Sequence, residues 1–295
     1  MPLSQAILAT LAYHDIFDYP LTLEEIHKYL INLEARPFTV RRGLNKLFLT
    51  GKIFSKNGYI FLKGRSEIVK LRKLREKYSL PKIKRAQFFA RILKVIPSLK
   101  LVAISGALAM ENSHKNDDID LVLITSKNTL WTTRFLANIL LLPYKRSPSV
   151  RQISDRACLN VFIDESQLKI GPPNLYLSHE ICQMKPLWNR DNTYRRFLSA
   201  NMWIKKYLPN WRPDVERLKT NDKRKKTSKA LVFKRLALVV EPLEALAKWG
   251  QLFYMRPKIT TEKIGDHQLF FHPADTQKWV MGEYQKRMKR LKISV

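Results

Sequence analysis

The sequence predicts an α+β protein whose centre is a mixed sheet with flanking helices. Apolar runs of strand length occur at 99–105, 119–125 and 156–164, and the segments around them show helical spacing. Ahead of these runs, three helical segments precede two short apolar runs that meet at Asn57-Gly58. Asn-Gly between two such runs is a strong β-hairpin signal. Three helices and a hairpin predict a small winged helix-turn-helix-like domain in front of the sheet.

We expect six segments along the chain. In the first segment, Thr22 to Glu25 forms a capping box that opens a helix, and Thr39 is expected to cap the third helix. In the second segment, a helical connector, Pro81 is expected to break the chain into two helices. The predicted segments are a winged-helix-like domain at 1–64, a helical connector at 65–98, the catalytic-type core at 99–170, a helical extension at 171–210, a basic linker at 211–229 that includes the run DKRKK, and a C-terminal helical region at 230–295.

Composition narrows the class of protein. The 295 residues suffice for two or three small domains, and a hydrophobic content of 45% is that of a globular protein. Two cysteines, far apart and in apolar settings, argue against a disulfide framework or a zinc site. The sequence shows neither a signal-peptide pattern nor an apolar run long enough to span a bilayer. We therefore expect a cytoplasmic protein without a transmembrane segment.

The charge of the chain predicts a polyanionic partner. Lys and Arg number 54 against 25 Asp and Glu, which gives a net charge of +29. Such an excess attracts RNA or DNA; an anionic membrane surface, or a proteome in which every protein is basic, are the alternatives. If the winged helix docks on nucleic acid, Arg41, Arg42 and Lys46 of its third helix are the candidate contacts. The alternative is a solvated basic face on a protein-interaction module.

The segment 118–124 carries the clearest chemical signal. Asp118 and Asp120 are separated by one residue at the start of an apolar run, so both side chains project to the same face of a strand. Two such carboxylates repel each other unless a cation lies between them. Oxygen ligands of this kind suit Mg²⁺, with substrate phosphates completing the coordination.

The run SGALAMENSHKNDDIDLVLIT resembles the signature of the DNA polymerase beta-like nucleotidyltransferase superfamily. Gly106 falls on the signature glycine and Asp118 and Asp120 on the paired acids, and the likeness covers residues 99 to 164. It implies catalytic residues Asp118, Asp120 and Asn160, with Mg²⁺ or Mn²⁺ bound by the two acids. It also implies that Ser105, Gly106 and Ala107 hold the phosphates of a nucleoside triphosphate. The usual serine after the glycine is Ala107 here, and Asn160 stands in the place of the third acid.

Several points stay open at this stage. Asp164 shares the strand parity of Asn160 and could substitute for the third acid, although it lies about 13 Å further along the strand. His179 and Glu180 are expected either to form a buried hydrogen-bonded pair or to contact a substrate. The leading hypothesis is an enzyme that transfers a nucleoside monophosphate to an unknown hydroxyl. The alternative is a non-catalytic nucleic-acid-binding or regulatory protein with a degenerate domain of this type.

Overall fold

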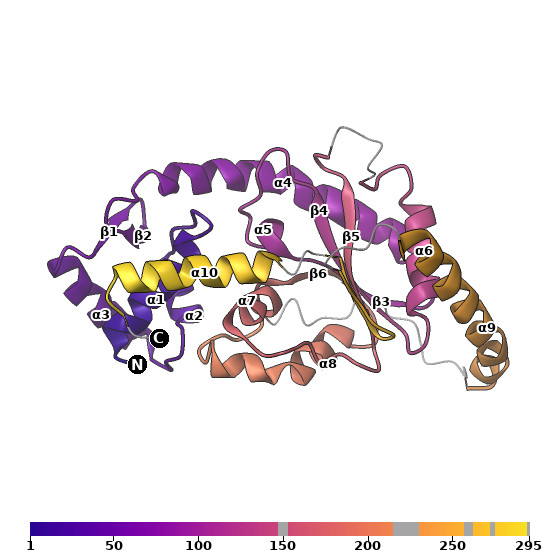
Figure 1. The fold of residues 1–295 in the computed structure, drawn as a ribbon. Helices are drawn as coiled ribbons and strands as arrows, with labels where there is room; N and C mark the ends of the chain where they lie inside the picture. Colours follow the sequence, from indigo (N-terminus) through magenta and orange to yellow (C-terminus); the bar gives the residue numbers. More distant parts are fainter. Residues whose placement is uncertain (147–152, 215–229, 257–261, 272–274, 294–295) are drawn as a thin grey trace.

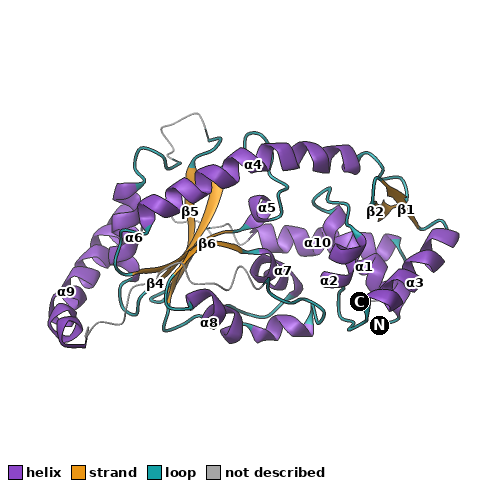
Figure 2. Cartoon of the chain, turned by 180° about the vertical axis from the view of Figure 1, so that it is seen from behind, coloured by secondary structure: helices purple, strands orange, loops and turns teal. Residues whose placement is uncertain are grey.

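The computed structural model describes residues 1–146, 153–214, 230–256, 262–271 and 275–293, without the side chains of 230–241 and 275. Within these ranges the chain is a mixed α+β protein, as predicted, with helices around one six-stranded sheet (Figures 1 and 2). The residues of the predicted linker from 215 to 229, including DKRKK, lie outside the described residues. No helix in the described ranges is both long and apolar enough to cross a membrane.

The first 62 residues form three helices and a hairpin. These are α1 (Leu3–Asp15), α2 (Leu23–Lys28), α3 (Pro37–Leu49), β1 (Ile53–Lys56) and β2 (Tyr59–Leu62). The capping box of Thr22 and Glu25 is present, with both reciprocal hydrogen bonds formed. Helix α3 begins at Pro37 rather than after Thr39, because proline is well suited to the first turn of a helix. The expectation that Thr39 caps this helix was therefore wrong.

A single helix, α4 (Ile68–Leu93), connects this unit to the sheet (Figure 1). The predicted break at Pro81 is absent, and the proline lies inside the helix. Tertiary contacts on both sides of it hold the helix. Arg72 makes two hydrogen bonds to the Glu25 carboxylate, at 2.7 and 2.9 Å, and buried Lys82 donates to the carbonyl of Asp117 at 2.6 Å. Anchored charges thus outweigh the local cost of the proline.

The sheet has the strand order β6-β3-β4-β5-β8-β7. Strands β3 (Leu99–Ile104), β4 (Ile119–Thr125) and β5 (Ala157–Asp164) are those predicted, and only the β4–β5 pair is parallel. Strand β6 (Lys185–Asn189) falls in the extension predicted to be helical. Strands β7 (Lys263–Ile264) and β8 (Gln268–Phe270) fall in the predicted C-terminal helical region. Both helical expectations were wrong in part, because these short strands form by pairing with β3 and β5.

Alternation along the strands separates two apolar layers. Leu121, Leu123 and Phe162 face a layer that includes α4, α6 (Leu130–Leu140) and α9 (Ala230–Met255). Val122, Ile124 and Val161 face the opposite layer, which includes α7 (Leu175–Gln183), α8 (Thr193–Ala200), the 3₁₀ turn η1 (Met202–Lys206) and α10 (Asp275–Arg290).

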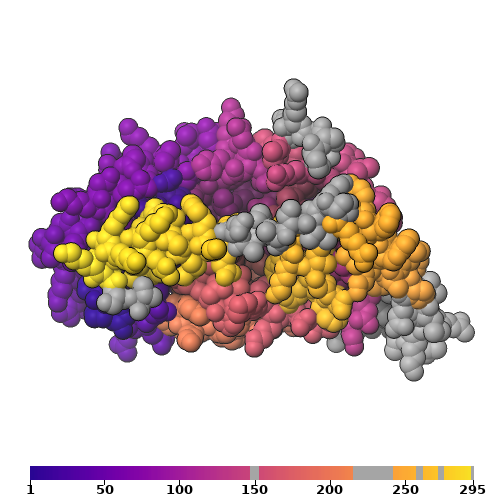
Figure 3. Space-filling model, in the orientation of Figure 1, coloured from indigo at the N-terminus to yellow at the C-terminus, as the bar shows by residue number. Residues whose placement is uncertain are grey.

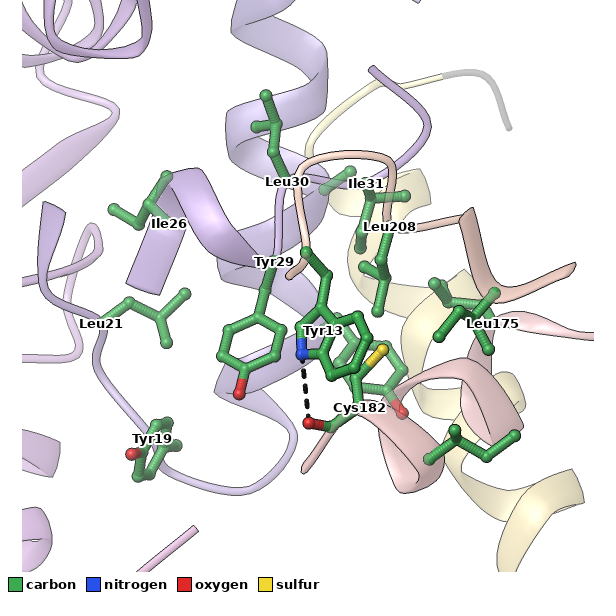
Figure 4. Close-up of a cluster of buried hydrophobic side chains, with 14 of the residues drawn as sticks. Tyr13, Tyr19, Leu21, Ile26, Tyr29, Leu30, Ile31, Leu175, Cys182 and Leu208 are labelled. Atoms are coloured by element: carbon green, nitrogen blue, oxygen red, sulfur yellow. Dashed lines mark hydrogen bonds between the residues drawn. The ribbon is translucent and has the colours of Figure 1, made fainter. Parts of the chain in front are cut away.

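The second layer is continuous with the core of the N-terminal unit. Tyr13 of α1 and Cys182 of α7 belong to one buried cluster, drawn in Figure 4. The indole nitrogen of Trp211 donates to the carbonyl of Cys182 at 3.1 Å within that cluster. Helix α10 lies along α1 and α7 (Figures 1 and 3). Helix α1 is therefore packed on both sides, with every residue from Ala6 to Asp15 buried.

Candidate functional site

The two predicted acids lie at the start of β4. Asp118 directly precedes the strand and Asp120 is its second residue. Parallel pairing places Cys158 of β5 opposite Asp120. One ligand atom from each of Asp118, Asp120 and Cys158 lies within 4.8 Å of the other two. The pairing of β4 with β5 thus builds a compact group that could hold a metal ion, as the alternation of Asp118 and Asp120 had indicated.

Asn160 lies beside this group, as predicted. Its amide Nδ2 donates a hydrogen bond to Oδ1 of Asp120, and its Oδ1 accepts one from the Cys158 thiol at 2.9 Å. The side chain is buried, with 4% of the residue exposed. A register shift between Leu121 and Val122 gives β5 one extra residue at this level, which brings both Cys158 and Asn160 to the acids.

Two members of the group were not predicted from the sequence. Cys158 is a neighbour of both acids, and the side chain of Arg146, half of it exposed, forms an ion pair of 3.0 Å with Asp118. Arg146 follows α6, and its backbone pairs with that of Ala157 at the start of β5. The parity of Cys158 with Asn160 on one strand was the signal that could have found the cysteine. Nothing in the sequence indicated Arg146.

Burial and the proximity of like charges raise the pKa values of two groups at this site. Burial, followed by the charge of Asp118, raises the pKa of Asp120 to about 7. Burial and the nearby carboxylates also raise the pKa of the Cys158 thiol. The thiol therefore keeps its proton at neutral pH, and its soft sulfur suits a hard cation less well than a carboxylate oxygen does. The carboxylate oxygens of Asp118 and Asp120 are of the kind that a hard divalent cation could use.

The turn before the pair approaches Asp120 closely. Gly106, the first residue of α5 (Gly106–Ala109), has φ of +62°, a conformation that other residues rarely adopt. A Cβ atom there would lie 3.4 Å from Oδ2 of Asp120. The backbone N–H of the preceding Ser105 donates to the carbonyl of Asp120 at 3.3 Å. Ser105 and Gly106 therefore lie next to Asp120, and Ala107 lines the same cavity as Asp120.

Asp164 does not belong to this site. It pairs with Thr125 at the other end of β4. Its carboxylate accepts hydrogen bonds from the backbone N–H of Asn128 at 2.7 Å and from that of Ser166 at 2.8 Å. These bonds fix two loops, so the suggestion that Asp164 could replace the third acid was wrong.

A cavity of about 210 Å³ adjoins the acids. Gly106, Ala107 and Asp120 form part of its wall, and α7 contributes Tyr176 and Glu180. Helix α1 and the loop after it contribute the residues that the sequence did not connect with this site, which are Tyr13, His14, Phe17 and Tyr19. A neighbouring cavity of about 240 Å³ shares Tyr176 and Glu180 and reaches Ser105.

The predicted hydrogen bond between His179 and Glu180 does not form. His179 accepts a hydrogen bond from Gln183 at 3.4 Å and stacks on Tyr13 with ring centroids 3.9 Å apart. Glu180 makes no side-chain hydrogen bond to any residue in the described ranges, and burial raises its pKa to about 7. The alternative that Glu180 serves a bound molecule stays open.

The candidate nucleic-acid contacts lie elsewhere. Arg41, Arg42 and Lys46 are exposed on α3, which stands at the end of the molecule remote from the sheet (Figures 1 and 2). They are separate from the carboxylates and form no ion pair with a residue of the described ranges. No protein-family model, characterised protein or solved structure matches the chain.

Proposed function

We propose that the protein is a metal-dependent nucleotidyltransferase that moves a nucleoside monophosphate from a nucleoside triphosphate to an acceptor hydroxyl. One observation carries the proposal: Asp118 and Asp120 project together beside Asn160 and next to the left-handed turn at Gly106. Two carboxylates on one face suit Mg²⁺ or Mn²⁺, which takes its other ligands from water and phosphate oxygens. Such an ion, when bound, lowers the pKa of the attacking hydroxyl and neutralises charge on the phosphates.

The chain's own residues have distinct roles in this proposal. Asp118 and Asp120 hold the ion, and Arg146 limits the repulsion between them through its ion pair with Asp118. Asn160 orients Asp120 through its amide; to offer an oxygen to an ion, that amide would have to turn over. The first N–H groups of α5, at Gly106 and Ala107, have no partner within the helix and can donate to phosphate oxygens.

Calorimetry tests this assignment directly. Titration with Mn²⁺ and a non-hydrolysable nucleoside triphosphate should give a binding signal that Asp120→Asn abolishes. Asp266→Asn is the matched control, because its side chain is 73% exposed and distant from the pair, and it should bind as the unmodified protein does. An unchanged signal in Asp120→Asn would disprove the proposal. Incubation with each labelled nucleoside triphosphate and total RNA then tests for transfer.

A second candidate function has support of its own. A binding or regulatory protein with an inactive domain would need no third carboxylate, and Asn160 stands in that place. The exposed cations on α3 would serve such a protein. Nucleic-acid binding together with an absence of metal-dependent nucleotide binding would favour this alternative.

A further inference from the structure

The cavity beside Asp120 differs in charge from the rest of the protein. The chain carries a net charge of +29, yet the residues that line this cavity include two carboxyl groups, those of Asp120 and Glu180, and neither lysine nor arginine. Away from the N–H groups of Gly106 and Ala107, a phosphate group placed in it would meet acids and no cation. The cavity therefore favours a positively charged or hydrogen-donating molecule.

The wall holds one buried hydrogen-bond acceptor without a partner, on His14, and a half-buried carboxyl group, that of Glu180. His14 is 2% exposed, and its Nδ1 bonds to the carbonyl of Thr10 at 2.9 Å. Since a carbonyl only accepts, Nδ1 carries the proton and Nε2 is left as an acceptor. Nε2 has no partner in the described structure. Burial lowers the pKa of His14 to about 4, so the ring is neutral at pH 7. The Glu180 carboxyl is a second acceptor.

Aromatic rings complete the wall. Tyr13, Phe17 and Tyr19 come from the N-terminal unit, and Tyr176 comes from α7. Aromatic faces attract an ammonium group, most strongly where water is excluded. At roughly 30 Å³ for each water molecule, the 210 Å³ of the cavity corresponds to about seven waters, which is room for a small organic molecule.

We propose that this cavity binds the acceptor of the transfer reaction, and that the acceptor is a small alcohol carrying an ammonium group. The assignment rests on the proposed function for the reaction itself, and on the cavity for the chemistry of the acceptor. The ammonium group lies among the aromatic rings with Glu180 and His14 Nε2 as its acceptors, and the hydroxyl points to Asp120. The hydroxyl oxygen bonds to the α-phosphorus, the bond from that phosphorus to the pyrophosphate oxygen breaks, pyrophosphate leaves, and the hydroxyl proton passes to solvent.

Matched pairs of small molecules test the charge preference. 3-Aminopropan-1-ol is compared with butan-1-ol, its neutral isostere, and glucosamine with glucose. Binding to the intact protein is measured by ligand-observed NMR without nucleotide or metal. We expect each ammonium compound to bind at least about tenfold more tightly than its neutral partner, on the scale of a desolvated cation–π contact. The preference should fall to below about threefold in Glu180→Gln, whereas Glu24→Gln, an exposed site on α2, should retain it.

Each outcome decides between the two proposals. Equal binding within both pairs, no binding by either ammonium compound, or a preference unchanged in Glu180→Gln would overturn the acceptor assignment. Calorimetry with Mn²⁺ and the nucleotide analogue on Glu180→Gln separates a failure of the acceptor assignment from a failure of the proposed function. That variant retains Asp118 and Asp120 and should still bind the nucleotide analogue if the proposed function holds. Transfer to RNA with no ammonium preference would leave the enzyme proposal standing and reject the acceptor class.

Discussion

The amide Nδ2 of Asn160 donates a hydrogen bond to the carboxylate of Asp120, joining β5 to β4 at the point where the two acids meet. This bond opposes the rise in the pKa of Asp120 that burial and the charge of Asp118 produce. A neutral amide satisfies Asp120 without adding a third negative charge. Asn160 therefore stabilises the group in the absence of a cation, at the expense of the stronger metal binding that a carboxylate would give.

Asn160→Asp should make the protein less stable without a cation and should strengthen its binding of a metal ion. A third buried carboxylate should lower the free energy of unfolding by about 1–3 kcal/mol in EDTA, because the added charge loses solvation and meets two like charges. Saturating Mn²⁺ should restore stability, and any transferase activity should rise. Thermal unfolding with and without Mn²⁺ measures the effect.

Asn45→Asp, an exposed site on α3, is the control for this substitution and should respond to Mn²⁺ as the unmodified protein does. If Asn160→Asp gains no Mn²⁺ stabilisation over that control, Asn160 does not occupy a ligand position.

Gly106→Ala should reduce both stability and function. Alanine at φ of +62° costs about 1–2 kcal/mol, and its Cβ would lie 3.4 Å from Oδ2 of Asp120. We expect Mn²⁺-dependent nucleotide binding to weaken by about tenfold or more, as for a misplaced group at a reacting centre. Chemical denaturation and calorimetry provide the two measurements.

The matched variant for Gly106 is Gly58→Ala in the hairpin turn. Gly58 has φ of +80° and nothing within 4 Å of its added Cβ, so it isolates the backbone cost. Both variants should lose similar stability, and only Gly106→Ala should lose nucleotide binding. Equal binding by the two would show that the close approach to Asp120 has no functional role.

Nucleic-acid binding, if it occurs through α3, should depend on Arg41, Arg42 and Lys46. The logarithm of the association constant should fall with log[salt] by about 0.7–0.9 for each phosphate neutralised. Replacing these three cations by alanine should reduce that slope by roughly two to three units. Fluorescence anisotropy with labelled RNA and DNA, over about 50–200 mM salt, measures it.

The control for α3 removes the same charge from another exposed face. Lys70, Lys73 and Lys77 lie exposed on α4, and their triple alanine variant should leave the slope nearly unchanged. A reduction in this variant instead would place the binding surface on α4. No measurable binding to either nucleic acid at about 50 mM salt would contradict the prediction, made from the net charge, that the protein binds RNA or DNA.

The sequence by itself determined the features that depend on short-range pattern. Apolar runs of strand length predicted β3, β4 and β5, and the shared parity of Asp118 and Asp120 predicted their common face. The capping box at Thr22 and the Asn-Gly turn likewise define a helix start and a hairpin through contacts a few residues apart. Such features are readable because the interacting groups are neighbours in the chain.

Only the tertiary structure decided which distant segments meet. Helix α4 continues through Pro81 because Arg72 and Lys82 are anchored on partners far away in sequence. Strands β6 and β8 form because β3 and β5 offer free edges, a condition their own residues do not encode. The docking of α1 on α7 places His14 and Glu180 in the wall of one cavity together with Asp120. Packing and pairing between segments that are tens of residues or more apart depend on the whole fold, and local propensity carries no information about them.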